Sequence, residues 1–382
     1  MLPNATKKLI IAGGGHASLP LIKMAGHWKD RNVSITLISA EPYLIYSGAL
    51  PQFMAGFYQI DETAIQLDQL CNRYGTEFIH ARITSIDKTE KFVTTSDGRQ
   101  ILYDLLVINV GASTPVPEII ENHYPVKPMS GLLPLREKLQ SGSIHNLLIA
   151  GAGAAGTELA LNLSHPSSLA GASVKIHLID KNSTILSKFP AKASGKAARI
   201  LAQRSVQVSD NTPFSAATSG EYNAVIVASG NKPESASLTH PFKTGEQNRI
   251  LTSLTLQVHG ETSVFAAGDT ADPGGRNLKQ IGVHAVKQGV LLRQNIEALL
   301  DGEPLKKYRP YPINPLIISN GPDCAIFIAG RFSLSGKFFA VLKYVLDMHW
   351  LEKYTMPPSD RRSRIKLIRD GVQRVVSARP VS

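Results

Sequence analysis

The chain has 382 residues, of which 43% are hydrophobic and 19% charged, as in an ordinary globular protein of two or three domains. Its two cysteines, Cys71 and Cys324, argue against a disulfide framework and a Cys-x-x-Cys redox centre, and so against oxidising export. The net charge is +11, and the segment from Arg331 onward holds eleven Lys/Arg against four Asp/Glu. Such a basic segment suits an anionic membrane, nucleic acid or an acidic partner, or is an ordinary solvated surface.

The N-terminal stretch MLPNATKKLIIAGGG leads directly into an expected strand and a glycine-rich loop. It has no charged region, apolar run and cleavage site in the order that a signal peptide requires. No uninterrupted apolar run of about 18 residues follows, so no membrane-spanning helix is expected. We therefore expect the protein in the cytoplasm, or peripherally on the inner face of the cytoplasmic membrane.

The first expected loop has the form of a dinucleotide-binding fingerprint with its last glycine replaced. After the strand come Gly13-x-Gly15-x-x-Ser18. In a Gly-x-Gly-x-x-Gly loop the glycines let the backbone approach a pyrophosphate at a helix N-terminus, and the third allows close helix–strand packing. Serine is small enough to weaken this motif without abolishing it, and the alternative for the loop taken alone is a tight turn.

The chain then repeats its own pattern. LIIAGGGHAS (9–18) matches LLIAGAGAAG (147–156), ITLISAEP (35–42) matches IHLIDKNS (176–183), and YDLLVINVGAS (103–113) matches YNAVIVASGNK (222–232). Each half predicts a strand, a glycine turn, a helix, a second strand and a later strand that ends in glycine. The repeat indicates a β-α-β dinucleotide-binding fold used twice.

The two halves differ where an acid should bind the ribose hydroxyls, at the end of the second strand. The first half has Ser39 there, with Glu41 two residues later, and the second half has Asp180. Asp180 would repel a 2′-phosphate and favours NADH, whereas the neighbouring Lys181 leaves NADPH open.

Further elements follow the second half. A strand in TSVFAAGDTAD (262–272) ends in Gly-Asp, and a helix is expected over 283–300. The C-terminal region predicts strands in RPYPINPLIISN and CAIFIAG, a helix over 337–354, and a basic tail after Pro357-Pro358.

These motifs together resemble the pyridine nucleotide–disulfide oxidoreductase superfamily of flavoproteins. Within it the chain looks most like type II NADH dehydrogenases, and closest to flavoprotein domains sometimes fused to selenophosphate synthetases. The resemblance covers nearly the whole chain, through GGGHAS, PYLIYSGALPQFMAGFY, YDLLVINVGASTP, GAGAAGTELA, VFAAGDTAD, GVHAVKQG and LSGKFFAVLKYVLD.

The resemblance implies FAD in the first unit and NADH or NADPH in the second. Expected at FAD are Gly13, Gly15, His16, Ala17, Ser18, Ser39, Glu41, Tyr46, Ser47, Pro51, Ile83, Gly111, Gly268, Asp269 and Val283. Expected at NAD(P)H are Gly151, Gly153, Ala154, Ala155, Gly156, Asp180, Lys181 and Gly230. No metal is expected.

Three residues are candidates for catalysis. Glu158 matches a glutamate near the nicotinamide in type II dehydrogenases, and the alternative is a first-turn acid favoured by the helix dipole. His284 and Gln288 match two glutamines that face flavin and quinone. His284 departs from that pattern and suits a substrate or proton-transfer role, or is a packed histidine.

Two further departures concern the substrate. The fused-domain subgroup usually has Pro-Lys before its Gly-Val, whereas here Lys279 is displaced. The redox-active disulfide of the wider superfamily is absent, which argues against disulfide reduction and against a sulfide-oxidising quinone reductase.

The helix expected over 337–354 permits two interpretations. Apolar residues, Phe338, Phe339, Leu342, Val345, Leu346 and Trp350, lie on one broad side, and the other side carries Lys343 and Asp347 as an i,i+4 pair. The helix is either packed against the protein or lies on a membrane surface, helped by the basic tail, where it admits a quinone from lipid.

The sequence thus predicts an α/β protein with two Rossmann-like domains, for FAD and NAD(P)H, and a small C-terminal α+β region. The expected ranges are 1–120 and 239–308 for FAD, 121–238 for NAD(P)H, and 309–382 for the C-terminal region. The expected function is an FAD-dependent NAD(P)H dehydrogenase that reduces a quinone-like small acceptor, with a homodimer allowed and no nucleic-acid partner. Its rivals are a flavin-dependent oxidase or reductase of a specific metabolite, and a reductase of a protein electron carrier.

Overall fold

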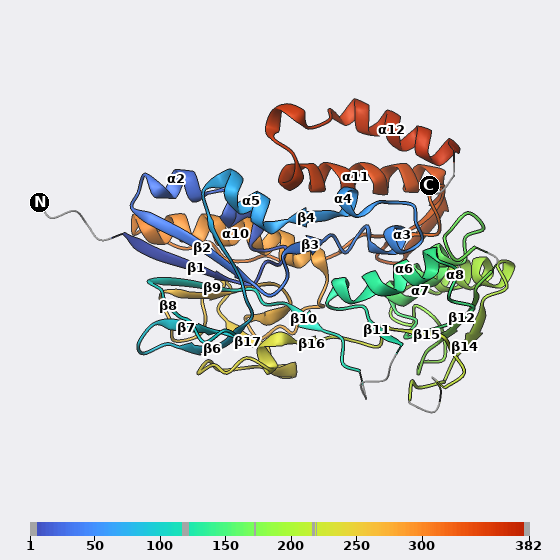
Figure 1. Ribbon diagram of the computed structural model, residues 1–382, viewed down its shortest axis with the longest axis horizontal. Helices are drawn as coiled ribbons and strands as arrows, with labels where there is room; N and C mark the ends of the chain where they lie inside the picture. The colour runs from blue at the N-terminus through green and yellow to red at the C-terminus, as the bar shows by residue number, and fades with distance from the viewer. Residues whose placement is uncertain (1–5, 117–121, 172, 216–217, 219, 378–382) are drawn as a thin grey trace, which may run out of the picture. The chain divides into compact units, whose positions relative to one another are not determined.

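The chain folds into two compact units that are interleaved in sequence. The computed structural model describes residues 6–116, 122–171, 173–215, 218 and 220–377 (Figure 1). Unit 1 comprises Met1–Leu44, Ile65–Ser113 and Lys232–Tyr311, and unit 2 comprises Ile45–Ala64, Thr114–Asn231 and Pro312–Ser382. The segment Ile45–Ala64 therefore groups with unit 2, although it lies within the range that we expected to bind FAD.

Unit 1 is built on a five-stranded parallel sheet with the order β18-β9-β1-β2-β5. Its strands are β18 (Val264–Ala266), β9 (Leu105–Ile108), β1 (Lys7–Ala12), β2 (Val33–Ser39) and β5 (Glu77–His80). The central strands β9, β1 and β2 are mostly apolar and buried because both faces of a parallel sheet are covered, whereas the edge strand β5 is partly exposed.

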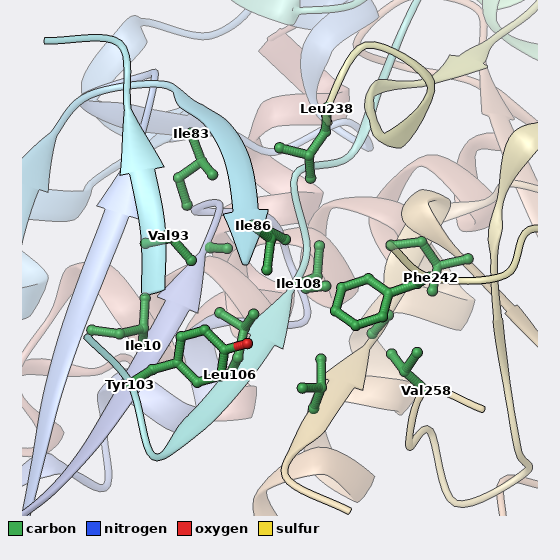
Figure 2. Packing of buried hydrophobic residues seen from close by; sticks show 14 of the residues in the cluster. Ile10, Ile83, Ile86, Val93, Tyr103, Leu106, Ile108, Leu238, Phe242 and Val258 are labelled. Carbon is green, nitrogen blue, oxygen red and sulfur yellow. The ribbon is translucent and has the colours of Figure 1, made fainter. Parts of the chain in front are cut away.

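Smaller strands complete the core of unit 1. They are β6 (Ile83–Asp87), β7 (Phe92–Thr95) and β8 (Gln100–Leu102), β17 (Ile250–Thr252) with β19 (Ala271–Pro273), and β10 (Ala112–Ser113) with β16 (Lys232–Pro233). Figure 2 shows Leu106 and Ile108 of β9 packed in one apolar cluster with Ile86 of β6 and with Phe242.

The helices of unit 1 include one long helix beside the parallel sheet. They are α1 (Leu19–Ile22), α2 (Ala25–Lys29), α5 (Leu67–Tyr74) and α10 (Gly282–Asp301), with short 3₁₀ turns η2 (Glu234–Ala236), η3 (Glu246–Asn248) and η4 (Gly268–Thr270). The single helix expected after the first glycine loop is wrong, since α1 and α2 replace it. Pro20 has no N–H to donate, and the turn before it closes through an i→i+3 bond from Ser18 N to Gly15 O.

Unit 2 repeats the sheet of unit 1, with the order β11-β15-β12-β13-β14 and every pair parallel. Its strands are β11 (His123–Pro125), β15 (Ala224–Val227), β12 (Asn146–Ala150), β13 (Lys175–Ile179) and β14 (Gln207–Ser209). β12, β13, β14 and β15 take the places of β1, β2, β5 and β9. The internal repeat predicted from the sequence is therefore confirmed, and β11 supplies the outer strand from the chain that precedes the repeat.

The remaining elements of unit 2 cover this sheet and form a C-terminal region. The helices are α3 (Leu50–Met54), α4 (Ile60–Thr63), α6 (Leu133–Gln140), α7 (Ala154–Leu163), α8 (Ala191–Gln203), α11 (Lys337–Thr355) and α12 (Arg364–Ser377), with 3₁₀ turns η1 (Met129–Leu132) and η5 (Pro358–Asp360). An antiparallel sheet joins β20 (Leu316–Ser319), β21 (Ala325–Ala329) and β22 (Phe332–Gly336). β3 (Tyr43–Ile45) pairs with β4 (Ala64–Gln66) where the chain passes between the units.

The C-terminal helices differ from the expected basic tail. The helix predicted over 337–354 is confirmed as α11, whereas the residues after Pro357-Pro358 form a second helix, α12, which packs along α11 (Figure 1). Gly371 makes the close packing possible, because a Cβ there would lie 3.0 Å from the ring of Tyr344. In the described part of the chain, none of the helices combines the length and apolarity that crossing a bilayer requires.

Candidate functional site

The first glycine loop leaves β1 through a turn that only glycine tolerates. Gly13 has φ +101°, and a Cβ there would lie 2.3 Å from the carbonyl oxygen of Asn109. A Cβ on Gly15 would lie 2.7 Å from Nδ2 of Asn109. The loop is thus pressed against the end of β9, and His16 and Ala17 continue it towards α1.

Ser18 replaces the third glycine with a hydroxyl that has two partners. Its Oγ donates to Gly13 O at 2.6 Å and accepts from Nδ2 of Asn109 at 2.9 Å, and the residue is fully buried. The comparable position of the second loop, Gly156, has no such space, since a Cβ there would lie 1.8 Å from Gly151 O. The first loop is therefore closed by hydrogen bonds where the second is closed by backbone contact.

Asn109 is the residue at this loop that sequence reasoning missed. It is buried at the end of β9 and also meets the Gly-Asp motif, because a Cβ on Gly268 would lie 2.6 Å from Asn109 Oδ1. α10 approaches from another side, where Gly289 would place a Cβ 2.7 Å from Ala17 O. A polar residue that ends the buried strand LLVIN was the available signal.

At the ribose position of unit 1 stands a hydroxyl rather than an acid. Ser39 is buried, its Oγ accepts a hydrogen bond from Glu41 N at 3.3 Å, and it lies 3.0 Å from where a Cβ of Gly14 would be. Glu41 follows in a half-buried position. Ser39 therefore lines the loop directly, and Glu41 is the nearby acid in sequence.

The other residues expected at FAD in unit 1 differ in their surroundings. Thr270 Oγ1 accepts a hydrogen bond from Gly111 N at 2.9 Å, which ties the Gly-Asp motif with its half-buried Asp269 to the end of β9. Ile83 is buried in the apolar core, whereas Val283 at the start of α10 is 44% exposed.

The second glycine loop has the three features that a pyrophosphate-binding loop needs. Gly151 has φ +108° and turns the chain after β12. Gly153 precedes α7 and has open space around its missing Cβ, with nothing within 4 Å. Gly156 packs against Gly151 O, as described above. Ala154 and Ala155 begin α7, whose N-terminal N–H groups and dipole favour an anion.

Asp180 supports this loop from the end of β13. Its carboxylate accepts hydrogen bonds from Ala152 N at 2.5 Å and from Asn182 N and Nδ2 at 2.8 and 2.6 Å. Lys181 beside it is exposed, and Gly230, with φ +131°, follows β15. The acid thus stands beside the glycine loop, in the place where such proteins bind a ribose.

Glu158 lies in a buried polar cluster of unit 2. Its Oε1 accepts hydrogen bonds from Ser319 N at 2.8 Å and Ser319 Oγ at 2.7 Å, and lies 4.0 Å from Lys343 Nζ. Burial raises the pKa of the Glu158 carboxyl, and the ammonium of Lys343 opposes that rise. The alternative interpretation of Glu158 as a first-turn acid is wrong, because α7 has no acid in its first turn and Glu158 is buried in the next.

Lys343 and Asp347 belong to the same cluster and lie on the buried side of α11. Both side chains are only 7% exposed, their ion pair is 2.9 Å long, and Lys343 Nζ also donates to Gly48 O at 2.6 Å. The exposed positions of α11 are instead apolar, with Phe338 at 70% and Leu346 at 53%. α11 thus buries this ion pair together with apolar residues such as Met348 and Leu351, and leaves part of its apolar side exposed.

Tyr46, Ser47 and Pro51 lie in unit 2, and Tyr46 joins this cluster. Its ring stacks on Trp350 with centroids 4.6 Å apart, and burial and the nearby Asp347 raise the pKa of its phenol. Ser47 is exposed, and Pro51 is buried in α3.

His284 and Gln288 lie one turn apart on the buried side of α10 in unit 1. Gln288 Oε1 accepts from Gly268 N at 2.6 Å, and His284 Nδ1 is 2.7 Å from Tyr308 Oη. Burial, followed by the charges of Lys287 and Arg249, lowers the pKa of His284, which favours the neutral ring. Tyr308 was not found from the sequence, where it lies in the Lys- and Pro-rich stretch EPLKKYRPYP.

The residues of both loops fit a bound dinucleotide, because each loop follows the carboxyl end of a central parallel strand and turns through left-handed glycines. Among the described residues, no group of three or more His, Cys, Asp or Glu could hold a metal ion. Cys71 is buried in unit 1 and Cys324 half-buried in unit 2, both as free thiols.

Known proteins share this sequence pattern and fold. The model of one family, "Pyridine nucleotide-disulphide oxidoreductase", matches residues 7–289. The type II NADH:quinone oxidoreductase of Staphylococcus saprophyticus is 23% identical over 381 aligned residues, covering 89% of this chain and 94% of the relative. Demethylphylloquinone reductase NdbB of Synechocystis sp. is 25% identical over 368 residues, covering 88% and 90%.

Solved structures show the same fold at low identity. NDH2 of Plasmodium falciparum in complex with NADH has a TM-score of 0.76 at 14% identity, with 97% of this chain and 98% of that chain covered. The sulfide:quinone oxidoreductase of Aquifex aeolicus has a TM-score of 0.74 at 20% identity, with 91% of each chain covered.

Proposed function

The chain belongs to the pyridine nucleotide-disulphide oxidoreductase family, and we propose that it passes two electrons from NAD(P)H through FAD to a quinone-like small acceptor. The family membership makes it a flavin-dependent NAD(P)H oxidoreductase, related at low identity to NADH:quinone oxidoreductases. The identity of the acceptor and the roles of individual residues are parts of the proposal.

The observation that carries the proposal is the pair of glycine loops at the ends of two matching parallel sheets. In the second loop, the open space at Gly153 and the acid Asp180 suit NADH, with Lys181 exposed beside them. In the first loop, Gly13, Ser18 and the Gly-Asp motif at Asp269 suit FAD. FAD, when bound, supplies the chemistry by accepting a hydride from the nicotinamide and releasing two electrons.

In this proposal the chain's own residues orient the cofactors and donate or accept protons. Burial raises the pKa of Glu158 and favours its neutral form, which suits a group that takes up and releases a proton in the buried cluster. Gln288 steadies the Gly-Asp motif through Gly268 N, and His284 faces the acceptor. Tyr46, Ser47 and Pro51 line the flavin, as the resemblance to type II dehydrogenases implies.

The same proposal includes peripheral contact with an anionic membrane through the C-terminal helices. α12 exposes Ile365 at 81% and Val376 at 77%, and α11 exposes Phe338 at 70%. The surrounding segment is basic, and apolar side chains flanked by Lys and Arg bind lipid interfaces. The S. saprophyticus relative is a quinone oxidoreductase by name, and quinones of this kind are apolar.

A second candidate function is oxidation or reduction of a specific small metabolite. It is favoured by His284, whose pairing with Tyr308 places a titratable group where type II dehydrogenases carry glutamine. The closer kinship that we propose, to flavoprotein domains fused to selenophosphate synthetases, agrees with this candidate as well as with the first.

One experiment separates these functions. The purified protein would be reduced anaerobically with NADH or NADPH while flavin absorbance is followed, and then reoxidised with menadione, ubiquinone-1 or oxygen. We expect bleaching by NADH and fast reoxidation by the quinones. A preparation without flavin, or a flavin that neither nicotinamide bleaches, would refute the proposal. Bleaching without quinone turnover would favour the metabolite enzyme.

A further inference from the structure

A chain of hydrogen bonds leads from the Gly-Asp motif to His284 within unit 1. Gly268 N–H donates to Gln288 Oε1 at 2.6 Å, Gln288 is hydrogen-bonded to the phenol of Tyr308, and Tyr308 Oη lies 2.7 Å from His284 Nδ1. All three side chains belong to residues that are at least 90% buried. Such a buried network has one arrangement of protons that satisfies every member.

The direction of each bond follows from its donors. Gly268 N can only donate, so Oε1 of Gln288 accepts and its Nε2 is left as the donor to Tyr308. Burial raises the pKa of Tyr308 to about 12, so the phenol keeps its hydrogen at neutral pH. With Gln288 donating to its oxygen, Tyr308 donates that hydrogen to Nδ1 of His284.

The ring of His284 then carries its proton on Nε2. A neutral imidazole that accepts at Nδ1 must donate at Nε2. Nε2 is not among the fully buried polar atoms that lack a partner, and no hydrogen bond of this nitrogen occurs within the described ranges, so Nε2 is partly accessible although His284 as a whole is 7% exposed. The network therefore ends in an N–H group available to a ligand.

The charges around His284 keep the ring neutral. Lys287 on the same helix and Arg249 before β17 lower its pKa, as does burial, and Asp269 of the Gly-Asp motif opposes them. The position in the first turn of α10 acts in the same direction as the cations, because the N-terminus of a helix is positive.

We propose that Tyr308 is a positioning residue that holds His284 as the Nε2–H tautomer, and that His284 donates this hydrogen bond to a ligand carbonyl oxygen. The inference rests on the proposed function, which puts flavin and acceptor at this end of α10. Two ligands offer the required chemistry: the pyrimidine ring of the flavin and a carbonyl of the acceptor. A donor aimed at a carbonyl stabilises the negative charge that develops there on reduction.

The test compares four variants of the flavin-loaded protein. Tyr308→Phe removes the phenol hydroxyl, His284→Ala removes the donor, and His284→Gln keeps an N–H donor. Tyr222→Phe is the matched control, because His177 Nδ1 and Tyr222 Oη form a similar pair, 2.6 Å long, on the sheet of unit 2.

The first readout is the tautomer itself. In ¹⁵N spectra of histidine-labelled holoprotein at pH 7.5, we expect one ring, absent in His284→Ala, with a protonated Nε2 and an unprotonated Nδ1. Tyr308→Phe should shift this signal, and Tyr222→Phe should leave it unchanged. A cationic ring or a protonated Nδ1 at His284 would overturn the proposal.

The second readout distinguishes the two ligands. If the partner is the flavin, Tyr308→Phe and His284→Ala lower the flavin midpoint potential, and His284→Gln restores most of it. If the partner is the acceptor, the potential is unchanged and the reoxidation rate with menadione falls about tenfold in His284→Ala. If the flavin midpoint potential and the reoxidation rate with menadione were each the same in all four variants, the proposal would be overturned.

Failure of the proposed function looks different from failure of this inference. The rate of flavin bleaching by NADH is measured first in every variant. If the wild type does not bleach, the proposed function fails, whereas the tautomer measured by ¹⁵N spectroscopy tests the Tyr308–His284 arrangement without any turnover.

Discussion

Ser18 shows how a residue outside the fingerprint can complete a dinucleotide loop. A third glycine permits close contact of helix and strand, as Gly156 does against Gly151. Ser18 instead connects Gly13 O to the side chain of Asn109. The sequence indicated that serine is small enough for the position, but the partner lies 91 residues away and could not be recognised from the loop alone.

We predict that Ser18→Ala destabilises the FAD-loaded protein by about 1–3 kcal/mol, because Gly13 O and Asn109 Nδ2 lose a partner in a buried site. The measurement is the thermal unfolding midpoint, together with FAD retention after gel filtration. The control is Ser34→Ala, which removes an exposed hydroxyl with a long 3.4 Å bond. Equal midpoints for the two variants would contradict the assigned role of Ser18.

The second loop allows ligand binding to be separated from stability. We predict that Gly153→Ala leaves the unfolding midpoint unchanged and weakens NADH binding at least tenfold, because the added methyl occupies the open space beside the start of α7. Gly156→Ala should lower the unfolding midpoint and also weaken NADH binding, since its Cβ would lie 1.8 Å from Gly151 O. The measurements are NADH titration of flavin bleaching and thermal unfolding.

The control for an added methyl is Gly195→Ala in α8, where nothing lies within 4 Å of the new Cβ. Alanine is the better helix former, so this variant should gain about 0.5–1 kcal/mol. If Gly153→Ala binds NADH as tightly as Gly195→Ala does, the space at Gly153 is not used by the ligand.

At the scale of elements, the glycine loops and buried strands were predictable and the pairing of helix faces was not. Parallel strands show as short apolar runs, and α10 and α11 have apolar periodicity over many residues. The periodicity of α11 nevertheless did not show that its buried side includes Lys343 and Asp347. Lys343 and Asp347 are buried because Gly48 and the carboxyl of Glu158 come from distant parts of unit 2 to meet them. No local pattern carries that information.

The helix α12 was missed for a related reason. Seven Lys, Arg or Asp residues within 361–374 suggested a solvated tail. In the structure Arg362 pairs with Glu352 of α11 and with Asp370, at 2.5 and 2.9 Å. These two ion pairs thus connect α11 and α12, and the composition alone does not predict them.

The buried cluster on α7 and α11 predicts a pH-dependent stability. Because the pKa of Glu158 in the folded protein is raised above its usual value near 4.5, its neutral form is favoured by folding. The corresponding stability is complete below pH 4.5 and is lost as the pH rises through the folded pKa. Glu158→Gln lacks this loss, so its free energy of unfolding should rise relative to wild type as the pH increases.

Urea denaturation at several pH values measures this difference. Glu303→Gln, which removes an exposed carboxyl after α10, is the control and should follow the wild type. A constant difference between wild type and Glu158→Gln from pH 4 to pH 8 would show that folding does not raise the pKa of Glu158.

At the scale of the whole molecule, charge and apolar exposure coincide in the C-terminal residues. We predict that Ile365→Glu together with Val376→Glu weakens binding to phosphatidylglycerol vesicles at least tenfold, since burying one such side chain contributes about 1.5–3 kcal/mol. Folding should be unaffected, because the two residues are 81% and 77% exposed. Vesicle co-sedimentation measures the binding.

The matched control is Leu102→Glu, which puts the same charge at a 56% exposed leucine in unit 1. Retained binding in Leu102→Glu and loss in the double variant would assign the contact to α12. Equal binding of all three proteins would exclude α12 as the lipid contact.

The interleaving of the two units has a consequence for biosynthesis. Unit 1 needs residues up to Tyr311, and unit 2 needs α12 near the end of the chain. A ribosome that has made the first 231 residues has supplied every strand of the unit 2 sheet, but the unit 1 sheet still lacks β18. The apolar strands β1, β2, β5 and β9 of unit 1 must therefore wait, exposed to aggregation, while the strands of unit 2 and then β18 are made.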